Sequence, residues 1–244
     1  MPQRKLRVEL IRHTPDPDAV VALGARLCYA AADLDALSER VAARDQTAFI
    51  RGVMDSGHLA MVEHASFTFA VEGVSRSLLA QITRHRIASF SVQSQRYVSM
   101  EEGFDYVVPP AVEALGEEAL ARFHEQMEQV RRWYAQWQRE VGGTGEKTNE
   151  DARFVLPNAC ATRMLVTMNA RELLHFFSLR CCMRAQWEIR ALAWEMLRLA
   201  RGVAPALFAS AGPGCLGPGC PEGAKSCGRA AEVRDRFERL MSES

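Results

Sequence analysis

The sequence has no long hydrophobic run and no excess of charge of either sign. No apolar stretch approaches the roughly 20 residues that a membrane-spanning helix needs. The first residues, MPQRKLRVEL, contain no signal-peptide core. Lys plus Arg number 30 and Asp plus Glu number 30, so no global field attracts nucleic acid or an anionic membrane. We therefore expect a cytoplasmic protein with no membrane or nucleic-acid partner, in which any anion site is local.

Internal repeats and convincing linkers are also missing from the sequence. Its 244 residues, 48% of them hydrophobic and 25% charged, are typical of a globular protein with a buried core. Only the stretch from Gly212 to Gly228, with six glycines and three prolines, must be irregular. We expect one domain over 1–211, followed by a Gly/Pro/Cys-rich tail over 212–244.

The seven cysteines are an odd number, and the sequence shows no export signal. Reduced thiols are therefore expected rather than a disulfide framework. Cys215, Cys220 and Cys227 form a C-x4-C-x6-C pattern, but zinc needs a fourth ligand and no histidine follows His175. Cys181-Cys182 falls in an apolar helical pattern typical of a core. We expect no metal site, and no cysteine has a neighbouring histidine that would mark it as a nucleophile.

Hydrophobic periodicity predicts both strands and helices. Alternating apolar residues predict strands over Arg7 to Arg12, Ala65 to Val71, Phe104 to Val108 and Arg163 to Met168. Apolar spacings of three and four predict helices from an Asp18 cap to Cys28, over Asp45 to Met54, Val74 to His85 and Val112 to Val141, and over Ala170 to Ala200 behind an Asn169 cap. This mixture predicts an α+β fold in a single domain.

The strongest local signal is the segment RHRIASFSVQSQRY. Arg84-His85-Arg86 ends a predicted helix, and the hydroxyls of Ser89, Ser91 and Ser94 and the guanidinium of Arg96 follow it. Guanidinium forks and short hydroxyl donors suit a phosphate or pyrophosphate. The alternative is that basic residues simply favour the last turn of a helix, and the hydroxyl-rich loop weakens it. Gln81 precedes Arg84 by three residues, so an amide that reads a uracil-like ring would lie beside a guanidinium.

A second cluster contains His58 and the pair Glu63-His64. Its spacing does not match the H-E-x-x-H zinc helix, so a metal site here is only weakly supported. A hydrogen-bonded structural imidazole is an equally good interpretation of either histidine.

A third cluster contains Arg153, Asn169, Arg171, His175 and Arg180. Arg171 and His175 are four residues apart and share a helix face, whereas Arg180, nine residues past Arg171, points about 180° away. One helix would then serve two ligands or two subunits. The alternative is a solvated face with salt bridges, but the surrounding apolar residues argue against it, because cations are rarely placed there without partners.

With these motifs in order, the chain resembles the flavin-dependent thymidylate synthases. The family signature is Arg-His-Arg, seven residues, then Ser, and Arg84 to Arg86 and Ser94 satisfy it, followed by Arg96-Tyr97. The upstream G-H-x4-E-H-x2-F-T-F run over Gly57 to Phe69 matches, as do the downstream R-x-x-L-P, N-A-R, L-R and A-Q-W-E-I elements. The resemblance covers roughly Arg7 to Ala209.

The resemblance implies an enzyme, a methyltransferase that carries out the reductive methylation of dUMP to dTMP. The carbon donor would be 5,10-methylenetetrahydrofolate, the hydride carrier FAD and the reductant NADPH, with tetrahydrofolate released. It also implies a central, mainly antiparallel sheet packed by long helices, and a homotetramer whose subunits share active sites. The alternative within this fold is a flavoprotein with altered chemistry, which would be motivated by Val92 and Ala60, where the family often has other residues. Ser91 also departs from the common pattern.

The resemblance assigns roles to individual residues. FAD contacts would come from His58, Arg84, His85, Arg86, Asn169, Arg171 and His175. Contacts to dUMP would come from Gln81, Arg84, Gln93, Ser94, Gln95, Arg96, Arg153 and Arg180. Arg180 would be the catalytic group, because its guanidinium favours the N3-deprotonated pyrimidine and so replaces attack by a cysteine. A rival from another class is a nucleotide- or nucleic-acid-binding module without chemistry, against which the balanced charge argues.

Overall fold

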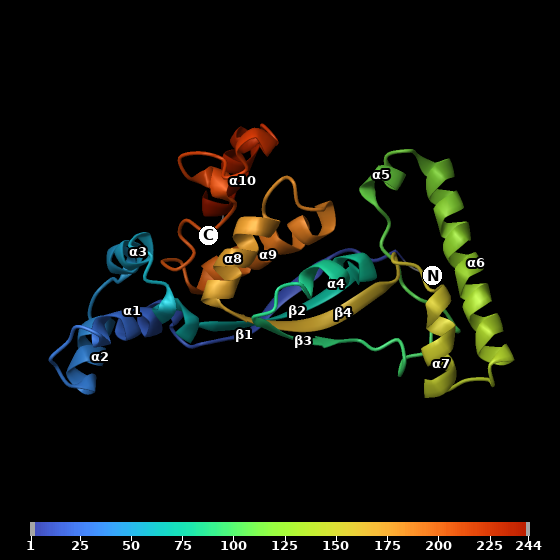
Figure 1. Cartoon of the computed structure of the whole chain (residues 1–244), viewed down its shortest axis with the longest axis horizontal. Coiled ribbons are helices and arrows are strands. Elements are labelled where there is room, and N and C mark those ends of the chain that lie inside the picture. Colours follow the sequence, from blue (N-terminus) through green and yellow to red (C-terminus); the bar gives the residue numbers. More distant parts are fainter. Residues whose placement is uncertain (1–2, 243–244) are drawn as a thin grey trace. The chain divides into compact units, whose positions relative to one another are not determined.

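The computed structural model describes residues 3–242 of the chain. Residues 1–2 and 243–244, which belong to the expected domain 1–211 and tail 212–244, lie outside the described residues. Four strands form one sheet in the order β1-β2-β4-β3 (Figure 1). They are β1 (Arg7–His13), β2 (Ser66–Ser75), β3 (Ala88–Val92) and β4 (Ala161–Asn169).

The sheet is antiparallel, as the pairing of β2 with β4 illustrates. Near the start of β2, the Thr68 hydroxyl hydrogen-bonds that of Thr167 over 2.9 Å. Just past its end, the Arg76 amide donates to the Cys160 carbonyl over 3.0 Å. Alternate residues of β2 and β4 are buried, so one face of these strands carries core side chains. The predicted α+β class with a central antiparallel sheet is confirmed.

The chain forms two compact units, and β2 and β4 each contribute residues to both. The first unit comprises the start of the chain to Arg7, Val71–Arg84 and Phe90–Leu165. The second comprises Val8–Ala70, His85–Ser89 and the chain from Val166 onward. The division of the sequence into a domain over 1–211 and a tail over 212–244 stays a prediction.

The first unit contains α4 (Arg76–Ile82), α5 (Pro110–Glu113), α6 (Glu117–Glu140), α7 (Glu146–Ala152) and the short helix η2 (Arg153–Val155). Helix α6 packs against α7, in green and yellow in Figure 1. The core of this unit includes Phe104, Tyr106, Met127, Tyr134 and Cys160. Burial of these large side chains fixes the place of α6 and, with it, of α7.

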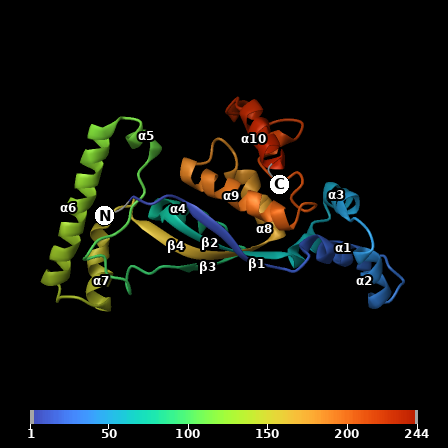
Figure 2. The same cartoon turned by 180° about the vertical axis from the view of Figure 1, so that it is seen from behind.

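The second unit contains α1 (Pro17–Leu27), α2 (Leu34–Ala42), α3 (Thr47–Asp55), η1 (Ala60–His64), α8 (Ala170–Arg180), α9 (Trp187–Val203), η3 (Gly214–Leu216), η4 (Gly223–Lys225) and α10 (Ala230–Ser242). Helix α1 packs against α2 and α3, and α8 packs against α9 and η1 (Figure 2). The tail over 212–228 is irregular apart from η3 and η4, as predicted. None of the helices between residues 3 and 242 is long and apolar enough to cross a membrane.

Two long helices predicted from periodicity are each divided in the structure. The pattern from Val112 to Val141 becomes α5 and α6, because Gly116 adopts a φ of 93° between them. The pattern from Ala170 to Ala200 becomes α8 and α9, because the Gln186 side chain accepts from the Glu188 amide over 3.0 Å and starts a new helix. The predicted Asn169 cap is confirmed, since its Oδ1 accepts from the Glu172 amide over 2.9 Å.

Other local predictions were wrong at the level of single elements. Helix α4 is shorter than predicted, because β2 continues past Gly73 to Ser75 and Ser75 caps the helix. Asp18 does not cap α1, because its carboxylate instead accepts the amides of Ala206 and Leu207. The segment predicted as a strand over 104–108 forms only isolated bridges at Tyr106. The sequence also did not indicate α2, β3 or α7.

Candidate active site

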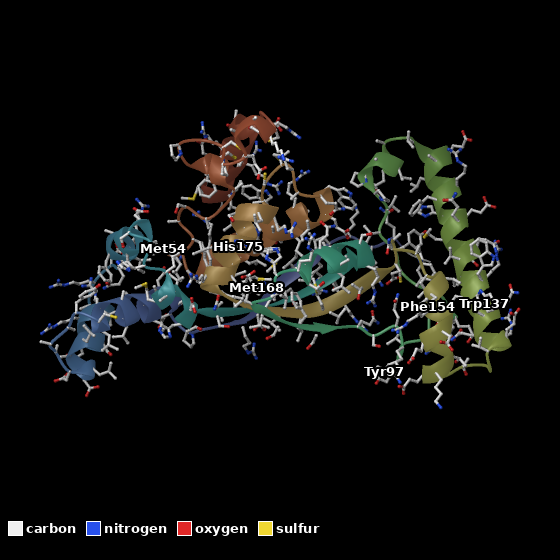
Figure 3. All side chains as sticks on the ribbon, viewed as in Figure 1. Met54, Tyr97, Trp137, Phe154, Met168 and His175 are labelled. Atoms are coloured by element: carbon white, nitrogen blue, oxygen red, sulfur yellow. The ribbon has the colours of Figure 1, made fainter. Side chains whose placement is uncertain are left out.

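Helix α8 and its N-cap residue present three of the predicted cofactor residues to one pocket. The pocket has a volume of about 620 Å³ and is lined by Asn169, Arg171 and His175, together with Leu59, Glu63, Ile87, Glu172 and Leu174. Figure 3 marks His175 on this helix. The spacing argument that places Arg171 and His175 on one face is therefore confirmed. The Asn169 cap that begins the helix also places its own side chain on the pocket wall.

The rim of this pocket carries both charge and exposed side chains. Arg171 forms an ion pair with Glu63, which belongs to η1. His58 is exposed in the turn between α3 and η1, one residue before the pocket residue Leu59, and Arg86 is exposed one residue before Ile87. Ala60, where the family often has a hydroxyl residue, is exposed at the start of η1. The structure thus places His58 and Arg86 next to wall residues but not in the wall itself.

His85 is buried, with only 5% of its surface exposed. Its Nδ1 lies 2.8 Å from Glu172 Oε1, and its Nε2 accepts from Arg180 Nε over 3.1 Å. Burial, followed by the charges of Arg180 and His175, lowers the pKa of His85, against the opposing effect of Glu172. Both ring nitrogens are therefore engaged within the chain.

Arg180 lies away from the pocket of Arg171, as its spacing on the helix predicted. It lines a different cavity of about 400 Å³, which Cys182, Cys215, Cys220 and Cys227 also line. Glu172 was not predicted as a site residue. Glu172 precedes Arg180 by eight residues, which places the two side chains only about 80° apart around a helix. This spacing was the signal in the sequence that could have placed them on one side of α8.

The predicted substrate residues other than Arg180 lie in the first unit. Arg96 follows β3 and forms ion pairs with Glu146 over 2.7 Å and with Glu150 over 2.6 Å, both on α7. Arg153 begins η2, and its Nε donates to the Glu150 carbonyl over 3.1 Å. Helix α7 thus brings Arg96 and Arg153 into one neighbourhood. Its role was missed, because EKTNEDA has no apolar period.

The loop of residues 93–96 is held by both main-chain and side-chain contacts. The Gln93 amide donates to the Arg163 carbonyl over 3.0 Å, and the Gln93 carbonyl accepts from Arg76 Nη2 over 2.7 Å. Ser94 Oγ accepts the Arg96 amide over 3.1 Å. Gln95 Nε2 donates to the Cys160 sulfur over 3.5 Å. Ser91 and Val92, which depart from the common family pattern, end strand β3 just before this loop.

Gln81 and Arg84 are close, though not as two residues of one regular helix. Helix α4 ends at Ile82, and Arg84 lies in the following turn, where its amide donates to the Gln81 carbonyl over 3.3 Å. The Arg84 side chain is exposed and Gln81 is half-buried. The prediction that both lie on one helix face was wrong, because the helix stops before Arg84.

All seven cysteines are free thiols. Burial raises the pKa of Cys181 and also that of Cys215, so neither is activated as a thiolate nucleophile. In the part of the chain that the structure describes, no group of three or more His, Cys, Asp or Glu side chains is arranged to hold a metal ion.

Comparison with known proteins identifies the family. The family model described as "Thymidylate synthase complementing protein" matches residues 9–206. A flavin-dependent thymidylate synthase of Geobacter sulfurreducens is 54% identical over 236 residues, covering 96% of this chain and 99% of the relative. Those of Nitratidesulfovibrio vulgaris and Clostridium tetani are 52% and 45% identical, each covering 94% of this chain and 97% and 96% of the relatives. The chain belongs to the flavin-dependent thymidylate synthase family.

Proposed function

We propose that this chain is a methyltransferase that converts dUMP to dTMP by reductive methylation, with 5,10-methylenetetrahydrofolate as carbon donor and FAD and NADPH as the reducing system. Tetrahydrofolate is the folate product. The observation that carries the proposal is that the chain aligns over nearly its whole length with enzymes of this name while Asn169, Arg171 and His175 line one pocket.

The chemistry of the α8 pocket fits FAD. An amide, a guanidinium and an imidazole face it beside the aliphatic side chains of Leu59, Ile87 and Leu174, which is the mixture of apolar wall and few polar groups that cofactor sites show. Asn169, Arg171 and His175 hold FAD, with His58, Arg84 and Arg86 contributing from adjacent segments. His85 contributes through its main chain, because its ring nitrogens are already engaged. FAD, when bound, supplies the hydride transfer.

The arginines of the first unit hold dUMP. Arg96 is 43% exposed, and two carboxylates of α7 set the direction of its guanidinium. Guanidinium forks such as those of Arg84, Arg96 and Arg153 match phosphate oxygens. The short donors of the Ser94 and Gln95 segment and the amides of Gln81 and Gln93 complete the substrate residues.

Arg180 is the catalytic group of the proposed reaction. A guanidinium next to the pyrimidine stabilises negative charge at N3 and O4 and so raises the electron density at C5, which accepts the carbon. A charged donor of this kind activates dUMP without a covalent bond to a cysteine. The raised pKa values of the buried thiols of Cys181 and Cys215 agree with a reaction that uses no cysteine nucleophile.

The active enzyme is a homotetramer in the cytoplasm, whose subunits share active sites. Support for an assembly comes from exposed aromatic side chains of the first unit: Phe154 is 83%, Tyr97 68% and Trp137 47% exposed (Figure 3). Burial of these side chains between subunits would remove their apolar surface from water, which favours association. Sharing between subunits also gives Arg180 and Arg171 separate ligands although they belong to one helix.

Formation of dTMP by the purified protein tests the proposal. With FAD, NADPH, dUMP and methylenetetrahydrofolate present, we expect dTMP whose formation requires each of them. Arg180→Ala abolishes turnover while FAD remains bound, and Arg122→Ala, which removes an exposed guanidinium on α6, is the matched control with normal turnover. A protein that binds FAD but makes no dTMP would favour a flavoprotein with altered chemistry, and one that binds no FAD would refute the proposal.

A further inference from the structure

We propose that His85 and Glu172 are positioning residues that hold the Arg180 guanidinium in the orientation needed to polarise the pyrimidine. The inference rests on the proposed function, since it concerns how Arg180 reaches its task. It is carried by a chain of contacts in the second unit that runs from Glu172 Oε1 through the His85 ring to Arg180 Nε, over 2.8 Å and 3.1 Å.

The donors and acceptors of this chain fix the tautomer of His85. The arginine Nε–H is a donor and has no acceptor capacity, so His85 Nε2 carries a lone pair rather than a proton. The single ring proton is therefore on Nδ1, from where it is donated to Glu172 Oε1. Glu172 thus selects the tautomer that accepts from Arg180, in the way that a carboxylate orients other functional imidazoles.

Packing prevents the imidazole from leaving this arrangement. The side chains of His85 and Glu172 are 3% and 9% exposed. The ring packs edge-on to Phe176, with centroids 5.0 Å apart, and lies 5.8 Å from the His175 ring. Glu172, Phe176 and Arg180 follow one another at intervals of four on α8, so one face of one helix presents the orienting carboxylate, the packing ring and the oriented guanidinium.

The guanidinium gains a defined plane from this contact. Nε lies in the plane of the guanidinium and at its root, so a bond to Nε restrains rotation of the whole fork about the side-chain stem. Displacement of a catalytic group by about 1 Å can lower the rate of the catalysed reaction by roughly 100-fold. Removing the contact therefore lowers turnover more than it lowers substrate or cofactor affinity.

The contact also makes turnover sensitive to the protonation of His85. The charged and titratable groups that face the ring are Glu172, His175 and Arg180. Protonation converts Nε2 into a donor, removes the acceptor of Arg180 and brings two cations together. We expect kcat to fall on the acid side, with a midpoint below the ordinary histidine pKa of 6.5.

Two substitutions at His85 separate positioning from packing. His85→Gln places an amide oxygen near the position of Nε2, where it still accepts from Arg180. His85→Asn places its amide near the position of Nδ1 and so removes the acceptor that His85 Nε2 offers to Arg180 Nε. We expect kcat to fall by roughly 10- to 100-fold in His85→Asn and by far less in His85→Gln. Binding of dUMP and FAD, measured by calorimetry and flavin absorbance, stays within about threefold of wild type in both.

A second pair of substitutions and the pH profile complete the test. Glu172→Gln keeps an acceptor for Nδ1–H and retains most of kcat, whereas Glu172→Met removes the acceptor and lowers kcat as His85→Asn does. The acid limb of the kcat profile is lost in His85→Gln, a change that a purely structural role would not produce. Equal kcat in the Gln and Asn variants, or an unchanged acid limb in His85→Gln, would overturn the inference.

The tautomer gives a measurement that needs no turnover. In ¹⁵N NMR spectra of histidine-labelled protein, His85 should show a protonated Nδ1 and an unprotonated Nε2. A protonated Nε2 would refute the positioning role even if dTMP is formed. Conversely, wild-type protein that makes no dTMP but shows the expected tautomer would refute the proposed function and leave the Glu172–His85–Arg180 geometry standing.

Discussion

Asn169 has two separable tasks, and substitutions at this one position distinguish them. Its Oδ1 accepts the Glu172 amide over 2.9 Å and caps α8, and its side chain also lines the pocket assigned to FAD. Replacing an N-cap Asn by Ala costs about 1 kcal/mol, within a range of roughly 0.5–2 kcal/mol. For a chain of this length, that corresponds to a fall in Tm of about 2–4 °C per kcal/mol.

Asn169→Asp should preserve the stability of the protein but weaken its binding of FAD. A carboxylate still accepts the Glu172 amide, and its charge interacts favourably with the helix N-terminus by about 0.3–1 kcal/mol. The same charge adds to Glu63 and Glu172 on the wall of the pocket, where it repels the phosphates of FAD. We therefore expect Asn169→Asp to unfold at or near the wild-type Tm and to bind FAD at least tenfold more weakly.

The assay is thermal unfolding of the flavin-free protein at one fixed protomer concentration, because assembly makes Tm depend on concentration. Flavin affinity is then titrated separately for each variant. Asn169→Ser, which keeps a capping oxygen without the charge, is the matched control for stability. If Asn169→Asp proves as unstable as Asn169→Ala, the capping argument is wrong, and if it binds FAD like wild type, Asn169 does not contact the cofactor.

Three further predictions concern the frame around the site. Asp18→Asn should lower the free energy of unfolding by roughly 2–4 kcal/mol. The backbone N–H groups of Ala206 and Leu207 donate to different carboxylate oxygens of Asp18, and Asn replaces one of these oxygens by an NH2 donor. Asp16→Asn, at a left-handed N-cap whose side chain makes no capping bond, should be nearly neutral in denaturant unfolding. Gly73→Ala should lower the free energy of unfolding by at least about 2 kcal/mol, because φ is 71° and the new Cβ would lie 2.0 Å from the Lys5 carbonyl oxygen. Gly57→Ala, at a φ of 80° with open space around it, should lose only the free energy of backbone strain. Equal losses of stability in the two variants would contradict this reasoning. Because the pKa of His85 is lowered in the folded state, the unfolded chain binds more protons than the folded chain as pH falls below 6.5, and the free energy of unfolding should decline there. His85→Gln should weaken that decline. Urea titrations at several pH values would measure both.

Features of the site that depend only on residues close together in the sequence could be predicted from it. The Asn169 cap and the shared face of Arg171 and His175 depend on helical spacing alone, and the structure confirms both. The ends of helices were harder to predict. Gln186 restarts the helix as α9 by capping two amides, and no glycine or proline between Ala170 and Ala200 marks the break.

Contacts between distant segments had no signal in periodicity. His85 meets Glu172 across 87 residues of sequence, and only the packing of the loop after α4 against α8 brings them together. Helix α7 had no signal in apolar periodicity, because its contribution is ionic and directed at Arg96. Helical spacing was thus predictable from the sequence, whereas the partners of these residues in distant segments required the fold.

The identity of the folate product tests the central claim most directly. In a reaction of purified protein with FAD, NADPH, dUMP and methylenetetrahydrofolate, dTMP and the folate products are separated and quantified together. Reductive methylation without a cysteine nucleophile predicts one tetrahydrofolate for each dTMP, with all activity lost in Arg180→Ala. One dihydrofolate for each dTMP would show that the folate supplies the hydride, and would contradict the account.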